Sequence, residues 1–429
     1  MQWLKEIPSH WEIEPFGRHF SYGKGLPITK ADLTPEGVAV ISYGQVHSKL
    51  NTGSSISRDL VRYVSSVHLE SHPQCLLVKG DFVFADTSED IEGSGNFAFN
   101  DFAEKIFAGY HTVVVRPKDL SFPRYYAYLF QSLNWKGQIQ SLVNGVKVYS
   151  INKGHLKKTY LLIPPLAEQE QIVSYLEDKT SKIGAYVSEK EKEILLLQEL
   201  KQKTIADAVT KGLNPDVKMK DSSSLISTFC PASWKIVRNK SFMSLTGVKV
   251  GNRADEYVLL SLTTKGIIVR DLESGKGKFP KDFDTYQFVR KGELVFCLFD
   301  IDETPRTVGL VDTEGMLTGA YTALKVNTEI ALPEYIYNYY LCVDNIKALK
   351  PYYSGLRKTV RADKFLQIYI PLPPLDEQRA IVSYIEEKCQ KIDKLASELQ
   401  SEIDDLKEYK QRLIADCVTG QVNVQKEVT

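Results

Sequence analysis

The stretch PPLAEQEQIVSYLEDKTSKI, Pro164–Ile183, returns 209 residues further along as PPLDEQRAIVSYIEEKCQKI, Pro373–Ile392. The copies share the Pro-Pro-Leu opening, the Glu-Gln pair and the Ile-Val-Ser-Tyr run. At the same offset KQKTIADAVTKGLN, Lys201–Asn214, is matched by KQRLIADCVTGQVN, Lys410–Asn423. A repeat this long in a chain of 429 residues indicates a duplicated pair of segments rather than a solenoid.

Each copy predicts one long helix, over residues 161–213 and 371–420. Between Ile381 and Val418 there is no Pro or Gly, and Glu, Lys, Gln and Leu dominate. Apolar residues recur at heptad spacing, which is typical of a coiled-coil seam. Because such helices are longer than a small globular core is deep, we expect them to pair with each other. The residues expected to form the pairing seam are Leu176, Ile183 and Leu197 in the first copy and Ile385, Ile392, Leu399, Leu406 and Leu413 in the second.

A second row of apolar residues adjoins this seam, with Ile172, Tyr186 and Leu200 in the first copy and Ile381, Leu395 and Tyr409 in the second. We expect this row to support the pairing. Lys190 occupies a seam position in the first copy and interrupts its heptad repeat.

The segments ahead of the helices are predicted to be two similar α/β domains, residues 1–160 and 229–370. Both hold short β-branched and aromatic runs separated by turn residues, which favours mixed or antiparallel sheet. Short stretches of the two segments are similar, such as IPSHWEI and CPASWKI, or KGDFVF and KGELVF. The polar, Ser-rich segment 214–228 is expected to be a linker, and 421–429 a tail. The predicted fold class is therefore α+β, with a pseudo-two-fold internal repeat.

Composition excludes several other classes of protein. Formal net charge is zero and hydrophobic residues make up 43%, which is ordinary for a chain with a real core. No apolar run is long enough to span a membrane, and we expect a cytoplasmic protein with no membrane partner. The six cysteines are scattered without metal-ligand spacing, so neither a disulfide framework nor a metal site is expected.

This layout resembles the specificity subunit of type I restriction–modification systems. The resemblance covers essentially the whole chain. Its most specific element is the I/L-P-P-L-x-E-Q-x-x-I-V segment that opens each long helix, at Ile163–Val173 and Leu372–Val382. The P-x-x-W start of each half and the K-G-D/E strand in each domain support it.

The resemblance implies two target-recognition domains that each read one half of a bipartite, asymmetric DNA site. The long helices would form an antiparallel coiled coil that sets the spacing of the halves, as protein geometry sets half-site spacing in dimeric DNA binders. The implied partners are double-stranded DNA, two methyltransferase (modification) subunits and, where present, motor/nuclease (restriction) subunits. No cofactor is expected on this chain itself. S-adenosylmethionine would be bound by the partners, as would ATP with Mg where a motor subunit is present.

The sequence carries none of the motifs that would make the chain an enzyme. There is no P-loop, no N-P-P-Y-like methyltransferase motif and no nuclease constellation. All seven His lie between His10 and His155, so the two halves cannot share a His-based mechanism. We therefore expect a non-catalytic subunit. Two alternatives stay open, a self-contained DNA methyltransferase and a coiled-coil scaffold that binds only proteins.

DNA reading requires cationic, amide or aromatic side chains on loops that reach a groove. The candidates lie in YGKGLPITK and NGVKVYS of the first domain and in TGVKVGNR, DETPRT and SGLRKTVRADK of the second. Taken singly, each of these residues could equally be an ordinary solvated surface residue. The next explanation is contact with a DNA phosphate rather than with a base. The DNA-binding candidates are Tyr22, Lys24, Lys30, Asn144, Lys147, Tyr149, Lys249, Arg253, Arg306, Arg357, Lys358 and Arg361.

Partner docking is expected at the helix openings, because the heptad seam does not require Glu168, Gln169, Glu377 or Gln378. The competing explanation is capping of the helix N-terminus. Capping accounts for the glutamates more readily than for the glutamines.

Overall fold

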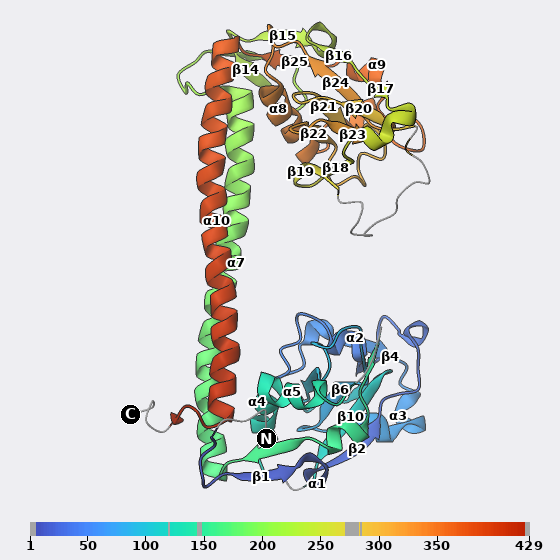
Figure 1. Cartoon of the computed structure of the whole chain (residues 1–429), viewed down its shortest axis with the longest axis vertical. Coiled ribbons are helices and arrows are strands. Elements are labelled where there is room, and N and C mark those ends of the chain that lie inside the picture. The colour runs from blue at the N-terminus through green and yellow to red at the C-terminus, as the bar shows by residue number, and fades with distance from the viewer. Residues whose placement is uncertain (1–5, 119–120, 144–147, 271–282, 284, 425–429) are drawn as a thin grey trace. The chain divides into compact units, whose positions relative to one another are not determined.

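The computed structural model describes residues 6–118, 121–143, 148–270, 283 and 285–424. It divides into two compact units, one formed by residues up to Glu191 together with those from Gln400 onward, the other by Lys192–Leu399. Each unit therefore holds one globular domain, part of the first long helix and part of the second (Figure 1). No helix within the described residues is both long and apolar enough to cross a membrane.

The two long helices are α7, Leu166–Lys211, and α10, Leu375–Val418, which confirms the prediction from the repeat. Both begin later than expected because the chain before each is a strand. These strands, β12 (Tyr160–Ile163) and β25 (Tyr369–Leu372), pair antiparallel with β1 (Glu12–Pro15) and β15 (Lys235–Arg238). Each pairing ties the first strand of a domain to the segment that enters its helix.

In the first unit the start of α7 packs against the end of α10. Leu176 and Ile183 share one buried cluster with Leu413 and Cys417. Lys190, which interrupts the heptad repeat, forms an ion pair with Glu402 of α10. Residues that come later in α7 therefore contact residues that come earlier in α10, so the two segments run antiparallel.

In the second unit the end of α7 packs against the start of α10. Ile205 and Val209 share a buried cluster with Ile385. The ammonium of Lys201 lies 2.7 Å from the Asp393 carboxylate. The predicted seam is confirmed as the buried side of these helices, with Leu399 buried and Leu197, Ile392 and Leu406 half-buried.

Only part of the adjoining apolar row is buried. Ile172 and Ile381 lie in the buried clusters of the first and second units, as expected. The rest of the row is on the surface, contrary to expectation. Tyr186, Leu200, Leu395 and Tyr409 are between 45% and 60% exposed. Ile403, which falls outside the predicted heptad row, is fully buried instead. The seam follows the residues that face the partner helix, and the other four residues of the second row remain on the surface.

Two sheets and two helices form the core of the first domain. β2 (Phe20–Lys24), β10 (Thr112–Pro117), β6 (Phe82–Ala85) and β8 (Phe97–Phe99) form one antiparallel sheet in that order. The second has the order β4 (Arg62–Val64), β3 (Val38–Ile41), β9 (Ile106–Ala108), β5 (Leu76–Leu77), with β3 and β9 parallel. Helices α4 (Pro123–Gln131) and α5 (Leu133–Gln140) bury their aromatic residues against the first sheet.

The second domain repeats the first sheet. β16 (Met243–Leu245), β24 (Thr322–Val326), β21 (Leu294–Phe296) and β22 (Val308–Leu310) lie in the same relative order, with α8 (Pro333–Asn345) in the position of α4. Its remaining sheets are β17 (Val248–Lys249), β20 (Gln287–Val289) and β23 (Gly315–Leu317), and the hairpin of β18 (Leu260–Thr263) and β19 (Gly266–Val269). The two domains are therefore one fold with two divergent sequences. Short helices complete the domains: α1 (Phe16–His19), α2 (Tyr43–Val46), α3 (His68–Ser71), α6 (Lys153–Lys157) and α9 (Ala362–Phe365).

Residues 214–228 are not a free linker, contrary to prediction. They contain β13 (Met219–Asp221), which pairs with β14 (Phe229–Pro231). The hydroxyls of Ser224 and Tyr339 are hydrogen-bonded at 2.8 Å. The serines that suggested a linker instead satisfy backbone and side-chain groups of the second domain.

The shared K-G-D/E motif forms the turn that precedes the central strand. The Asp81 carboxylate accepts a hydrogen bond from the Val78 amide at 2.9 Å, and Glu293 accepts one from the Arg290 amide at 3.0 Å. Both acids are nearly fully buried. The motif is thus a structural requirement of β6 and β21 rather than a chemical site.

The shared P-x-x-W motif forms a turn that closes over the end of a long helix. The Trp11 amide donates to the Pro8 carbonyl, and the Trp234 amide to the Pro231 carbonyl, both at 3.0 Å. A Cβ added to Gly420, which follows α10, would lie 2.3 Å from Pro8 Cδ. A Cβ on Gly212, which follows α7, would lie 3.3 Å from the Trp234 ring.

A buried tyrosine in each domain binds the C-terminal end of one of the two long helices. Tyr125 Oη donates to the Val418 carbonyl of α10, and Tyr335 Oη donates to the Val209 carbonyl of α7, both at 3.2 Å. Burial raises the pKa of both phenols well above its ordinary value, so they remain protonated donors at neutral pH. Each domain therefore holds the end of the long helix that belongs to the other half of the repeat.

We expect Gly420→Ala to destabilise the protein by about 2 kcal/mol. Gly420 has φ of +72°, and its new methyl group would collide with Pro8. The matched control is Gly184→Ala in α7, where an added Cβ meets nothing within 4 Å. That change should stabilise by about 0.5–1 kcal/mol through helix propensity. Chemical denaturation measures both, and equal effects would contradict the packing described here.

Candidate nucleic-acid interface

In each domain the loop after the central strand lies against the loop that precedes the last short helix. In the second domain the Asp300 amide donates to the Arg357 carbonyl, and the Val360 amide to the Leu298 carbonyl, both at 2.8 Å. In the first domain the same position is occupied by β7 (Thr87–Ser88), which pairs with β11 (Tyr149–Ser150). We call these the paired loops, residues 86–96 with 148–151 and residues 297–307 with 354–360.

Ion pairs hold the two paired loops of the second domain together. Arg357 forms an ion pair with Asp300 at 2.7 Å, and its guanidinium lies over the Phe299 ring. Lys358 contacts the carboxylates of Glu303 at 2.9 Å and Asp302 at 3.1 Å. The hydrogen bond from Lys358 lowers the pKa of Asp302, and that to Glu303 raises the pKa of Lys358. Both predicted cations are thus present on the surface, but each has its charge compensated within the domain.

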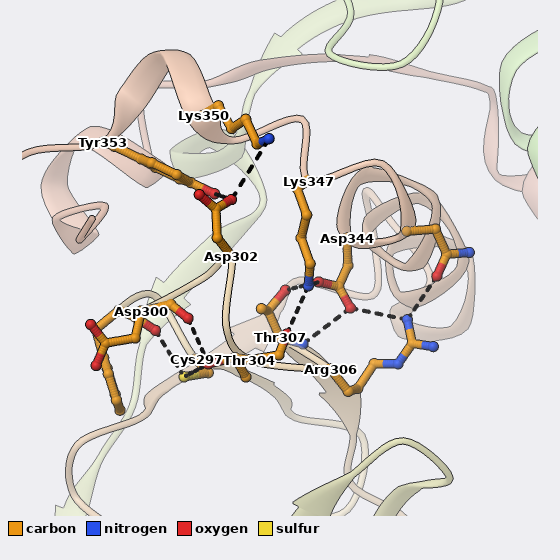
Figure 2. Close-up of polar contacts among 12 residues, drawn as sticks. Cys297, Asp300, Asp302, Thr304, Arg306, Thr307, Asp344, Lys347, Lys350 and Tyr353 are labelled. Atoms are coloured by element: carbon orange, nitrogen blue, oxygen red, sulfur yellow. Dashed lines mark hydrogen bonds and ion pairs between the residues drawn. The ribbon is translucent and has the colours of Figure 1, made fainter. Parts of the chain in front are cut away.

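A buried carboxylate anchors this region to α8. Figure 2 shows Asp344 surrounded by Arg306, Thr307 and Lys347. The Asp344 side chain is 2% exposed, and it contacts Arg306 at 3.0 Å and Lys347 at 2.7 Å. It also accepts hydrogen bonds from the Thr307 amide and hydroxyl. Arg306 was predicted to contact DNA, but this structure uses it to neutralise a buried acid.

A second set of contacts holds residues 302–304, in the loop after the central strand. Asp302 accepts a hydrogen bond from Tyr353 Oη at 3.1 Å, and Lys350 lies 3.9 Å away (Figure 2). Lys347 Nζ donates to the Thr304 carbonyl at 2.8 Å. These contacts hold the conformation of the loop from within the domain.

The paired loops of the first domain border an open pocket of 670 Å³. Asn96 Nδ2 lies 3.1 Å from His47 Nδ1, and His47 Nε2 lies 2.7 Å from the Thr87 carbonyl. Because Asn96 donates to Nδ1, the histidine carries its proton on Nε2 and donates to Thr87. The Lys136 ammonium donates to Asn96 Oδ1 at 2.7 Å, and burial lowers its pKa. The pocket lining also includes Tyr43, His111, Glu89, Asp90, Glu92 and Val148.

Backbone strain gathers at these loops. Within the described residues five non-glycine residues have positive φ. Two of them lie in the paired loops, Asp300 at 46° and Lys358 at 44°, and a third, His111 at 54°, lies in the lining of the pocket. Such conformations cost about 1–3 kcal/mol each and concentrate at functional sites. The paired loops are therefore the strongest candidate for the DNA-contacting surface of each domain.

The other predicted contacts are dispersed over the two domains. Lys24 ends β2, and Lys30 lies in a 3₁₀ turn; both are exposed. Tyr22 lies in β2 with the Lys157 ammonium 5.6 Å from its ring centroid, and burial raises its pKa to about 12. Tyr149 belongs to the paired loops.

In the second domain Lys249 and Arg253 are exposed on and just after β17, and Arg361 is exposed immediately before α9. Arg253 lies 6.0 Å from the Tyr257 ring centroid. Asn144 and Lys147 lie outside the described residues.

The glutamines at the helix openings have a structural role. Gln169 donates to the Pro164 carbonyl at 2.8 Å and Gln378 donates to the Pro373 carbonyl at 2.8 Å. Gln378 also accepts from the Leu332 amide. Both side chains are buried, so they offer no surface to a partner. Glu168 contacts His10 at 2.8 Å, and Glu377 is half-buried beside Gly212.

Sequence reasoning missed the acidic half of the paired loops. Asp300, Asp302 and Glu303 follow the KGELVF strand, and Glu89, Asp90 and Glu92 follow KGDFVF. The signal was present, because both acidic runs stand at the same place after the shared motif. The search for cations alone passed over them.

The comparisons with known proteins agree on one family. The model of the type I restriction modification DNA specificity domain matches residues 21–195 and 300–404. The chain is 25% identical to the putative type I restriction enzyme MjaX specificity subunit of Methanocaldococcus jannaschii, covering 98% of this chain and 96% of that one. The type I restriction enzyme MjaVIII specificity subunit of the same organism is 24% identical over 70% of each chain.

Solved structures show the same fold. A chain from a structure of complex assembly and conformational transition in the type I R-M system superposes with a TM-score of 0.67 at 16% identity, covering 97% of this chain and 100% of that one. The HsdS subunit from Thermoanaerobacter tengcongensis gives 0.50 at 16% identity, covering 97% and 99%.

The chain belongs to the type I restriction–modification DNA specificity family. It is accordingly a DNA-recognition specificity subunit. A self-contained methyltransferase and a protein-only scaffold are not favoured.

We expect Arg306→Ala to lower the free energy of unfolding by about 2 kcal/mol, because it removes one partner of a buried carboxylate. The matched control is Arg361→Ala, whose exposed pair with Asp363 should contribute little. Urea denaturation of both variants measures the difference. If Arg306→Ala leaves stability unchanged, Asp344 is not held as described.

Proposed function

We propose that the two globular domains read two unlike halves of a split, asymmetric sequence in double-stranded DNA, and that α7 and α10 set the distance between the halves. The supporting observation is that the repeat has a constant part and a variable part. The contacts that hold each domain to the helices are the same in both, whereas the paired loops differ in sequence and charge. A common frame that carries unlike loops would produce an asymmetric site rather than a palindrome.

We further propose that the long helices dock two methyltransferase subunits at equivalent positions. Tyr186 and Leu395 occupy matching places in the repeat, as do Leu200 and Tyr409, and all four expose their side chains. Tyr186 and Tyr409 line one shallow hollow in the first unit. Exposed apolar groups that gather in one patch mark interaction sites, and aromatic residues are enriched there. The repeat offers such groups at two matching places.

In this proposal the chain carries out no chemical step. The partners bind S-adenosylmethionine and transfer the methyl group. A motor/nuclease subunit, where one joins, binds ATP with Mg²⁺. This chain contributes the position on DNA at which those reactions take place.

Native mass spectrometry of the chain co-expressed with its methyltransferase tests the assembly. The expected complex has one copy of this chain, two methyltransferase chains and one bound DNA duplex that carries the split sequence. A chain that stays alone, or that binds protein but no DNA, would overturn the proposal.

The docking positions are tested by Tyr186→Glu with Tyr409→Glu, and separately by Leu200→Glu with Leu395→Glu. Each pair should reduce the complex from two methyltransferase chains to one, because a charge on a buried apolar contact is costly. All four side chains are exposed, so the fold should be kept. Two bound methyltransferases in both double variants would exclude these positions.

We expect Arg357→Ala with Arg361→Ala to weaken DNA binding. The slope of log affinity against log salt should fall by less than two, because both arginines are already paired, Arg357 with Asp300 and Arg361 with Asp363. The control is Arg412→Ala, an exposed arginine on α10 paired with Asp416. Unchanged affinity at low and moderate salt would remove these arginines from the interface.

A further inference from the structure

Leu356 is fully exposed, more so than any other large apolar side chain within the described residues. It stands at the tip of the paired loops in the second domain, between Gly355 and Arg357. We propose that Leu356 reads DNA by apolar contact with the methyl group of a thymine in the major groove. This inference rests on the proposed function of the domain and assigns one position of its half-site to one side chain.

The tip that carries Leu356 is rigid. Ser354 and Thr359 form an isolated antiparallel bridge, in which each amide donates to the other's carbonyl at 2.9 and 3.0 Å. Lys358 is held at a positive φ inside this bridge. The neighbouring loop adds the bond from the Asp300 amide to the Arg357 carbonyl. A side chain on so constrained a turn loses little conformational entropy on binding.

The charges around Leu356 do not suit a phosphate contact. Arg357 and Lys358 are paired with Asp300, Asp302 and Glu303, so the tip presents compensated cations beside three carboxylates. Cations that are already paired have little charge left to offer a phosphate. Base edges in the major groove offer donors to carboxylates, acceptors to arginine and one apolar group, the thymine methyl. Leu356 has the chemistry for that apolar group.

The first domain carries a similar residue order. Its corresponding stretch, Asn144-Gly145-Val146, also places an aliphatic residue directly after a glycine. The order glycine then aliphatic residue is therefore common to the two sequences.

The test uses the assembled complex of this chain with its methyltransferase. Genome-wide mapping of methylated sites gives the bipartite sequence recognised by the parent protein. Leu356→Ala should relax one position in one half-site and leave the other half unchanged, which provides an internal control. The matched control variant is Leu245→Ala, an exposed leucine in β16 of the same domain. It should leave both half-sites unchanged.

Binding to synthetic duplexes identifies the contact. Each thymine of the affected half-site is replaced in turn by deoxyuridine, which lacks only the methyl group. One replacement should weaken binding of the parent complex about fourfold, the value of one buried methyl group. Leu356→Met should keep that sensitivity, and Leu356→Ala should lose it.

The outcomes separate this inference from the proposed function. A parent complex that neither binds nor methylates a split sequence overturns both. A parent complex with a normal half-site, unchanged in Leu356→Ala, overturns only the role of Leu356. Relaxed recognition with no sensitivity to any thymine methyl overturns the methyl contact and indicates a wedge between base pairs instead.

Discussion

The structure depends on the way each domain holds a helix end that belongs to the other half of the sequence. The Tyr125 hydroxyl satisfies a carbonyl in the last turn of α10, and the Tyr335 hydroxyl does the same for α7. These carbonyls have no partner within their helices, and in a buried site an unpaired carbonyl costs free energy comparable to a lost hydrogen bond. The P-x-x-W turn then closes over the glycine that follows each helix. Because the requirement is the same twice, the residues that meet it have stayed alike in the two halves.

The paired loops follow the opposite logic. They contact the rest of the domain through backbone hydrogen bonds and a few buried groups such as Asp344, so their exposed side chains are free to vary. In the second domain this freedom has produced compensated cations with an apolar tip. In the first it has produced a pocket lined by histidines, tyrosine and carboxylates. A constant frame with variable loops is how one fold comes to recognise different targets.

Much of the frame could be predicted from the sequence. The heptad row around Ile385 and Leu413 is long and periodic, so the two helices and their buried side followed from spacing alone. Part of the second apolar row was misplaced, because the burial of Tyr186 and Leu395 depends on the exact orientation of the partner helix, which spacing does not determine. Residues 214–228 were taken for a linker because they are rich in serine. A Ser-rich sequence looks the same whether its serines form turns and hydrogen bonds or face water.

The candidate site was harder to predict than the frame. The loops around Arg357 and Tyr149 were found because they combine cations, glycine and aromatic residues. The partner of Arg357 is Asp300, 57 residues earlier in the chain, and no local pattern reveals such a pairing. For the same reason Arg306 could not be recognised as the counter-ion of Asp344 before the fold was known.

The P-x-x-W turn of the first domain has a consequence for how the chain is connected. Gln421, just beyond α10, donates to the Glu6 carbonyl, and Gly420 lies against Pro8. The equivalent junction of the second domain, between Gly212 and Trp234, is bridged by continuous chain. The polypeptide thus makes the same junction once through covalent bonds and once through contact alone. A circular permutant, opened within residues 213–218 and joined across the present ends, would exchange these two kinds of junction while preserving every contact that holds the domains to the helices.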